Sequence, residues 1–210
     1  MEPRQPAAGD RVRRIAECGV AASLTLVLAS IRVFQLPMGG SVTAGAAVPL
    51  WLLARRHGAA AAIVAGACAG GLQFCLTGSP VVHWAQPFID YGLGWAVLGL
   101  GGLGRGGRLA AAAFSAFLRF QVHVLSGLLF YRQFAFQNGY TPMAWTLAYN
   151  ASYMVPDAAL ALYLYALLGA RLEPQASTGP AEGPGAPGRS LAWAGPGLAV
   201  LLSAAILLAW

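Results

Sequence analysis

Long apolar runs with few charged residues dominate this sequence and constrain its fold most. Six of these runs approach or exceed the roughly 20 residues that a helix needs to cross a bilayer. They are Ile15–Val33, Ala59–Leu76, Val81–Leu103, Leu109–Phe130, Ala144–Leu168 and Leu191–Trp210. Apolar residues make up 58% of the chain and charged residues 10%, which leaves too little polar surface for a water-soluble globule. The sequence therefore predicts an integral membrane protein.

The residue pattern within the runs favours helices over strands. The runs are continuously apolar and rich in Ala, Gly and Leu, without the alternation of a membrane β-barrel. Val42–Leu53 is shorter and contains Pro49, which is compatible with a short helix or a partly buried re-entrant segment. Counted as the second helix, it completes an all-α fold with a six-helix core and a seventh, C-terminal transmembrane helix.

Changes in composition divide the chain into four expected parts. Residues 1–14 form an N-terminal arm, and residues 15–170 form the membrane domain. Residues 171–190 form a linker rich in Pro, Gly and Ala, and residues 191–210 form an accessory helix that anchors the chain or packs at its periphery. The first run lacks the cleavage site of a signal peptide, so it is expected to be retained.

Arginine sets the expected orientation, because the chain contains no lysine. Most arginines fall in loops on one predicted side, which is therefore expected to be cytoplasmic together with the N-terminus of a multi-pass protein of a prokaryotic plasma membrane. These are Arg11, Arg13, Arg14, Arg55, Arg56, Arg105, Arg108 and Arg171. This asymmetry accounts for the net charge of +6, so no nucleic-acid partner is expected.

Several kinds of chemistry have no support in the sequence. The three cysteines, Cys18, Cys68 and Cys75, lie in apolar runs without the spacing of metal ligands. A phosphate-binding loop for ATP is also missing. We therefore expect no metal site, no cofactor and no ATP hydrolysis by this chain, and any energy source must lie in a partner.

Four ionisable residues inside the apolar runs are candidates for function, because charge is costly in a membrane. They are Asp90, Arg119, His123 and Asp157. Arg119 and Asp157 are expected to form a deep structural ion pair, which leaves the carboxylate of Asp90 without a counter-charge. In the alternative interpretation, Asp90 pairs with Arg119 and both residues are structural.

Asp90, His123 and Asn150 are expected to reach similar depths from three different helices. At about 1.5 Å per residue they lie about 14, 10 and 9 Å below the outer helix ends. Aromatic residues gather at the same level, namely Tyr91, Tyr131, Trp145, Tyr149 and Tyr153. Gly127, one helical turn from His123, leaves room beside the imidazole. An unpaired carboxylate among aromatic rings predicts an outward-facing pocket for a cationic aromatic ligand.

Four segments resemble the ThiT family, the thiamine-specific substrate-binding S components of energy-coupling factor (ECF) transporters. They are Leu36-Pro37-Met38-Gly39-Gly40-Ser41, Phe88-Ile89-Asp90-Tyr91, Arg119-Phe120-Gln121-Val122-His123-Val124-Leu125-Ser126-Gly127 and Tyr149-Asn150-Ala151-Ser152-Tyr153-Met154-Val155-Pro156-Asp157. The resemblance runs in order from Glu17 to Leu168. It implies a six-helix subunit that captures thiamine from outside, while a membrane coupling subunit and two cytoplasmic ATPases drive uptake.

The resemblance also implies roles for individual residues. Asp90 would face the thiazolium charge with Tyr91 beside it, and Tyr131 and Trp145 would stack on the rings. His123 and Asn150 would hydrogen-bond to the aminopyrimidine. The small residues Gly19 and Ser23 on the first helix would form a docking face for the coupling subunit. Such spacing of small residues is also common in ordinary membrane bundles.

The sequence differs from the family at two positions in the expected pocket, so the identity of the ligand stays open. The family commonly has Glu at the position of Asp90 and Trp at that of Tyr131, so a thiamine precursor or another vitamin would fit a reshaped pocket. A passive scaffold or channel subunit is a further alternative. An intramembrane hydrolase using Ser126 and His123 is less favoured, because no orienting third group or oxyanion donor can be named. The chain is therefore expected not to be an enzyme.

Overall fold

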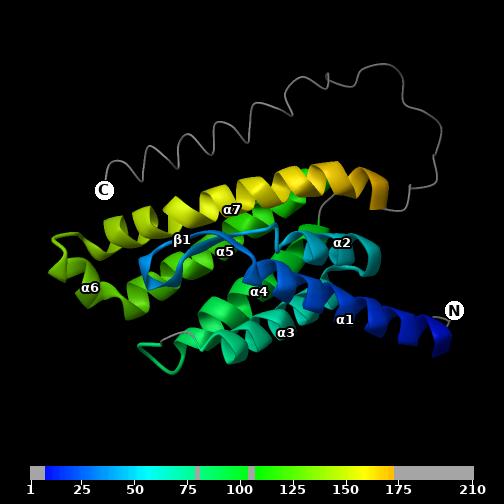
Figure 1. Cartoon of the computed structure of the whole chain (residues 1–210), viewed down its shortest axis with the longest axis horizontal. Coiled ribbons are helices and arrows are strands. Elements are labelled where there is room, and N and C mark those ends of the chain that lie inside the picture. Colours follow the sequence, from blue (N-terminus) through cyan, green and yellow to red (C-terminus); the bar gives the residue numbers. More distant parts are fainter. Residues whose placement is uncertain (1–7, 79–80, 104–106, 173–210) are drawn as a thin grey trace, which may run out of the picture.

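The computed structural model describes residues 8–78, 81–103 and 107–172 (Figure 1). The elements are α1 (Ala8–Ser30), β1 (Arg32–Gln35), η1 (Pro37–Gly39), β2 (Ser41–Thr43), α2 (Val48–His57), α3 (Ala59–Thr77), η2 (Phe88–Leu93), α4 (Gly94–Ala96), η3 (Val97–Gly102), α5 (Arg108–Phe130), α6 (Arg132–Gln137) and α7 (Pro142–Leu172). The two long helices α5 and α7 lie side by side and are joined through the short helix α6, while α1, α2 and α3 pack on the other side of the segment formed by η2, α4 and η3.

Three described helices are long and apolar enough to cross a membrane, namely α3, α5 and the Pro142–Leu168 part of α7. Helix α1 begins at Ala8 rather than at Ile15, so its first turns contain the arginines expected in the N-terminal arm. The short helix α6 lies between the apolar runs of α5 and α7, where the sequence predicts no helix. The linker expected at 171–190 starts two residues too early, because α7 continues to Leu172; residues 173–190 and the last span, Leu191–Trp210, lie outside the described residues.

The all-α expectation needs one correction, because a small antiparallel hairpin joins α1 to α2. Strand β1 pairs with β2 in a register that sets Arg32 opposite Thr43. The chain reverses where Met38 and Gly39 have positive φ angles of 68° and 97°, which glycine adopts without strain. Since residues 41–43 belong to a strand, α2 begins at Val48 and not at Val42.

The span expected at Val81–Leu103 is also corrected. It begins as a helix only near Phe88 and changes from the π-helical turn η2 through α4 to the 3₁₀ segment η3. Glycines on α3 let this segment approach closely: a Cβ atom on Gly66 would lie 2.5 Å from the carbonyl oxygen of Trp95, and one on Gly70 would meet that of Tyr91. π-Helical turns are frequent at functional sites, and η2 contains Asp90.

One half of the bundle is filled by a packed hydrophobic core. Leu50 and Trp51 of α2 and Tyr165 of α7 are fully buried, and Leu98 of η3 is 1% exposed. The indole Nε1 of Trp51 donates a hydrogen bond to Ser115 Oγ at 2.9 Å, so the polar atom of this large ring is satisfied. This core fills the space between α2, η3, α5 and α7.

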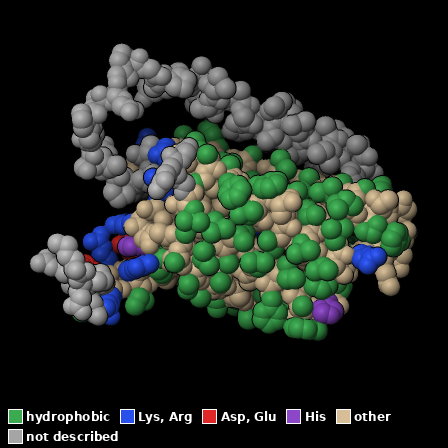
Figure 2. Space-filling view, turned by 180° about the vertical axis from the view of Figure 1, so that it is seen from behind, with side chains coloured by type: hydrophobic (Ala, Val, Ile, Leu, Met, Phe, Trp, Pro, Cys, Tyr) green, Lys and Arg blue, Asp and Glu red, His purple; other side chains and the backbone are tan. Residues whose placement is uncertain are grey.

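The core lies toward an arginine-rich end of the molecule. Figure 2 shows basic side chains gathered at that end, while apolar side chains cover most of the visible flank. Glu17 of α1 lies 3.0 Å from Arg13, 3.1 Å from Arg56 and 2.6 Å from His57. These contacts join the start of α1 to the end of α2. Arg105 lies outside the described residues.

Candidate functional site

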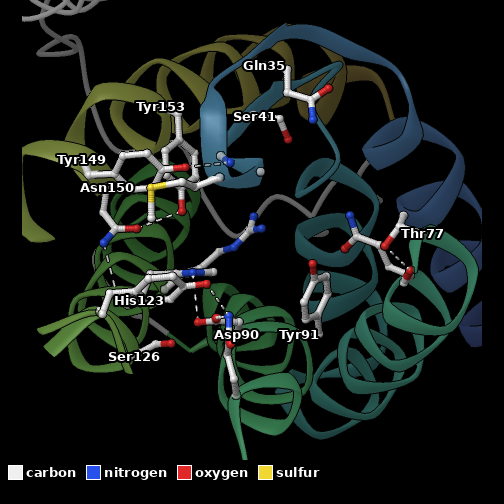
Figure 3. A pocket seen from close by; sticks show the side chains of 18 of the residues that line it. Gln35, Ser41, Thr77, Asp90, Tyr91, His123, Ser126, Tyr149, Asn150 and Tyr153 are labelled. Carbon is white, nitrogen blue, oxygen red and sulfur yellow. Dashed lines mark hydrogen bonds and ion pairs between the residues drawn. The ribbon is translucent and has the colours of Figure 1, made fainter. Parts of the chain in front are cut away.

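A cavity of about 430 Å³ occupies the half of the bundle opposite the arginine-rich end. Its walls come from the hairpin, the end of α3, η2, α5 and α7 (Figure 3). All seven residues that the sequence suggests for ligand binding line it, namely Asp90, Tyr91, His123, Gly127, Tyr131, Trp145 and Asn150. Residues distant in the sequence thus converge on one space.

One wall of the cavity contains polar atoms that no other described group satisfies. Asp90 Oδ1, His123 Nε2 and Ser126 Oγ are buried without a hydrogen-bond partner in the described part of the chain. Asp90 Oδ1 lies 3.4 Å from His123 Nδ1, and Figure 3 shows these side chains on the same side of the cavity. Buried polar atoms are normally paired, so this wall suits a polar ligand.

Arg119, on the wall of the cavity, forms a charge pair with Asp157, which lies behind that wall. Arg119 Nη1 lies 3.7 Å from Asp157 Oδ2, and its guanidinium carbon lies 4.0 Å from the centre of the Trp95 ring. Asp157 Oδ1 also accepts hydrogen bonds of 2.7 Å from the backbone N–H and the hydroxyl of Thr43. The pair therefore fixes the hairpin to α7, whereas Asp90 contacts Gln86 and His123.

The wall formed by α7 is aromatic. The rings of Trp145 and Tyr149 are stacked with an interplanar angle of 5° and centroids 6.5 Å apart. Asn150 donates to the carbonyl of Thr146 at 2.9 Å and to that of His123 at 3.4 Å. Its Oδ1 accepts from the Tyr153 hydroxyl at 2.9 Å. The amide of Asn150 thus holds α7 against α5, and a ligand that bonds to it has to replace one of these contacts.

The hairpin covers the aromatic wall and is attached to it. The Tyr149 hydroxyl donates to the carbonyl oxygen of Pro37 at 2.6 Å and accepts from the N–H of Gly40 at 3.0 Å. A Cβ atom on Gly40 would lie 2.6 Å from the Tyr153 ring, so only glycine fits without movement. Tyr149 and Tyr153 were noted in the sequence only as nearby aromatic residues.

Small residues were predicted at two places, with Gly127 in the cavity and Gly19 with Ser23 on a docking face. Gly127 lines the cavity, and a Cβ atom there would lie 2.5 Å from Thr146 Cγ2, so this glycine also lets α5 and α7 approach. Gly19 and Ser23 do not line the cavity; they lie exposed on α1, and a Cβ atom on Gly19 would meet nothing within 4 Å. That face of α1 is free of contacts within the described chain at Gly19.

Sequence reasoning missed several cavity residues. Gln86 donates to Asp90 Oδ2 at 3.1 Å and to the Tyr131 hydroxyl at 2.9 Å. Gln73 of α3 has a buried, unpartnered Oε1 on the cavity wall. Neutral amides in apolar segments are less conspicuous than charges, but the spacing of four residues between Gln86 and Asp90 was a usable signal. The hairpin residues were missed because the hairpin itself was not predicted.

Comparisons with known proteins agree with this architecture. The sequence model of the family described as Thiamine transporter protein (Thia_YuaJ) matches residues 15–176. The thiamine transporter ThiT of Bacillus subtilis (strain 168) is 29% identical, and the match covers 70% of this chain and 84% of that protein. A solved structure of ThiT from Listeria monocytogenes has the same fold, with a TM-score of 0.64 at 21% identity, over 76% of this chain and 94% of that one.

The family match extends over most of the chain, including every residue that lines the cavity. It confirms the resemblance noted in the sequence, and it answers the hydrolase alternative, because the family consists of transporters and not of enzymes. This chain belongs to the thiamine transporter protein family, Thia_YuaJ.

Proposed function

We propose that the cavity binds thiamine and that the chain is the substrate-binding S component of an ECF-type importer. One observation carries the proposal: a buried carboxylate, Asp90, has an oxygen without a hydrogen-bond donor in the described chain and lies in a cavity with aromatic walls. This environment favours a delocalised organic cation. Membership of the thiamine transporter family makes thiamine the cation of choice.

The dimensions of the cavity agree with this ligand class. Sites for small organic molecules typically measure about 300–1,000 Å³ and combine apolar walls with a few placed polar groups. The cavity of about 430 Å³ lies within that range. Buried polar atoms without a partner in the described chain occur at Asp90, His123 and Ser126, and stacked rings occur at Trp145 and Tyr149, so a ligand with a polar and an aromatic part finds partners for both.

Each residue would then have a defined role. Asp90 offsets the thiazolium charge with Tyr91 beside it, while Tyr131 and Trp145 stack on the rings. His123 donates to or accepts from the aminopyrimidine through Nε2, which has no partner within the described chain. Asn150 takes part only by exchanging one of its bonds to Thr146, His123 or Tyr153.

Transport requires an orientation and partners. We propose that the six-helix core crosses the membrane with the arginine-rich end in the cytoplasm and the cavity toward the outside. Leu191–Trp210 would add a seventh, anchoring helix. A membrane coupling subunit would dock on the face of α1 that exposes Gly19 and Ser23, where small residues permit close helix packing. Two cytoplasmic ATPases would supply the energy.

A second candidate is an S component for a thiamine precursor that retains the aminopyrimidine. The observation in its favour is that the Asp90 side chain is one methylene shorter than the Glu common in the family. The contacts on the His123 side of the cavity would be kept, and those to the thiazolium would be weakened. Comparing thiamine with a free aminopyrimidine in the same assay separates the two candidates.

The test is calorimetric titration of the detergent-purified full chain with thiamine, with riboflavin and biotin as ligand controls. We expect saturable binding of thiamine alone. Asp90→Asn should weaken it roughly 10- to 100-fold, because an interaction with a charged group is lost. Asp10→Asn is the matched control, since Asp10 is exposed on α1 and outside the cavity. Failure of folded protein to bind thiamine would refute the proposal.

A further inference from the structure

Gln86 is buried two residues before η2 begins, and every polar atom of its side chain forms a hydrogen bond. It is 5% exposed. Its Oε1 accepts from the N–H of Val82 at 3.0 Å, and its Nε2 donates to Asp90 Oδ2 at 3.1 Å and to the Tyr131 hydroxyl at 2.9 Å. A primary amide has two donor hydrogens and one acceptor oxygen, so this arrangement uses both hydrogens and the oxygen.

The amide orientation follows from its neighbours. In the flipped orientation, Oε1 would face the carboxylate of Asp90, and Nε2 would face the N–H of Val82. Both contacts would be repulsive, so only one orientation is compatible with this environment. The hydrogen that reaches Asp90 is therefore fixed by the backbone of the turn before η2.

The hydrogen bond from Gln86 determines which oxygen of Asp90 is available to a ligand. Oδ2 is engaged by the amide, whereas Oδ1 has no donor in the described chain and lies 3.4 Å from His123 Nδ1. The same amide holds the hydroxyl of Tyr131, which lies where α5 ends and α6 begins. The carboxylate and one aromatic wall residue are thus linked through a single side chain.

We infer that Gln86 is a positioning residue for ligand binding: it holds Asp90 so that Oδ1 faces the ligand, and it fixes Tyr131 to the same carboxylate. This inference rests on the proposed binding of thiamine in the cavity. Gln86 acts through Asp90 and Tyr131 and makes no required contact with the ligand. Preorganisation of this kind strengthens binding because the ligand does not have to order the carboxylate itself.

Two substitutions distinguish this role from a merely structural one. Gln86→Met keeps the length of the side chain and removes all three hydrogen bonds. Gln86→Glu keeps an acceptor for the N–H of Val82 but sets a second carboxylate against Asp90. If Gln86 served only to hold the turn at Val82, the Glu variant would bind thiamine like the wild type. We expect instead that both variants lose roughly 10- to 100-fold in affinity, with Glu the weaker binder.

A double-mutant cycle shows whether the effect passes through Asp90. In an Asp90→Ala background one acceptor is gone, so Gln86→Met should lower thiamine affinity by a clearly smaller factor than in the wild type, and the remaining loss reports the bond to Tyr131. Gln133→Met on α6 is the matched control, since Gln133 is exposed and outside the cavity; its affinity should equal that of the wild type. A wild-type affinity for Gln86→Met, or equal losses in both backgrounds, would overturn the inference.

Melting temperatures of the same four proteins without ligand test this inference independently of the proposed function. Melting temperatures of the wild type, the two single variants and the double variant should be non-additive, because Gln86 and Asp90 share a hydrogen bond. If the wild type fails to bind thiamine, the proposed function fails, and additive melting temperatures would then refute the Gln86–Asp90 link as well. Non-additive melting temperatures would keep that link while the ligand is sought again.

Discussion

Ser115 and Ser126 lie on the same helix, α5, and are both almost fully buried, yet their hydroxyls differ in what they contact. Ser115 Oγ accepts from Trp51 Nε1 at 2.9 Å and donates to the carbonyl of Ala112 at 2.8 Å. Ser126 Oγ has no hydrogen-bond partner in the described chain and faces the cavity. The first hydroxyl belongs to the core, and the second is available to a ligand.

Alanine at each serine should therefore affect different properties. Ser115→Ala leaves the buried indole N–H unpaired, which costs about 1–3 kcal/mol, so the melting temperature should fall while thiamine affinity stays the same. Ser126→Ala removes a hydroxyl next to the Asp90 carboxylate and no bond of the core, so the melting temperature should fall less than in Ser115→Ala while affinity drops roughly three- to tenfold. Thermal unfolding and calorimetry on both variants check this. A loss of affinity in Ser115→Ala alone would contradict the assignment.

At the scale of single residues, sequence reasoning works where a side chain is costly in its surroundings. Asp90 and His123 were identified because ionisable groups are rare in apolar runs, and the structure brings both to one cavity. Gln86 carries no charge, so composition gives no reason to single it out, and only its spacing of four residues from Asp90 points to it. The internal bonds of Asn150 depend on how α5 and α7 pack, which a linear pattern does not specify.

At the scale of elements, the contact between α3 and η2 depends on glycine. Gly70 lies where a Cβ atom would meet the carbonyl oxygen of Tyr91, next to Asp90. Its neighbour Gly71 has nothing within 4 Å of an added Cβ atom. Gly70 and Gly71 are adjacent in the sequence, but only Gly70 lies on the face of α3 that contacts η2.

Gly70→Ala should force α3 and η2 apart and displace the carboxylate of Asp90. Overpacking of this kind typically costs about 1–3 kcal/mol, so both the melting temperature and thiamine affinity should fall. Gly71→Ala should leave affinity unchanged and match or exceed the wild-type stability, because alanine is the better helix former. Equal behaviour of the two variants in thermal unfolding and titration would argue against the close contact.

The elements that the sequence did not predict share a cause. Strands β1 and β2 contain four and three residues, which is too short for an alternating pattern to stand out between apolar helices. The change from η2 through α4 to η3 arises from glycine-mediated packing against α3, a tertiary effect on a segment that reads as one apolar run. The long helices α3, α5 and α7 were predictable because length and hydropathy alone define them.

At the scale of the whole molecule, every residue that lines the cavity lies between Arg32 and Tyr153. A chain ending at Leu172 keeps all of these residues and the full length of α7. We expect such a truncated protein to bind thiamine within about twofold of the full chain in detergent. Calorimetry on both proteins checks this, and a larger loss would show that the site also needs residues after Leu172.

The arrangement of core and cavity limits how a solute can move. Below the cavity lie the Arg119–Asp157 pair and then Trp51 and Leu98, which surround a void of only about 10 Å³. That void is about the volume that one water molecule needs. Trp51 and Leu98 belong to the packed hydrophobic core, together with the fully buried Leu50 and Tyr165. If the cavity opens to the outside as we propose, a bound solute meets these packed side chains on its way inward, and its delivery requires either their rearrangement or a movement of the whole subunit.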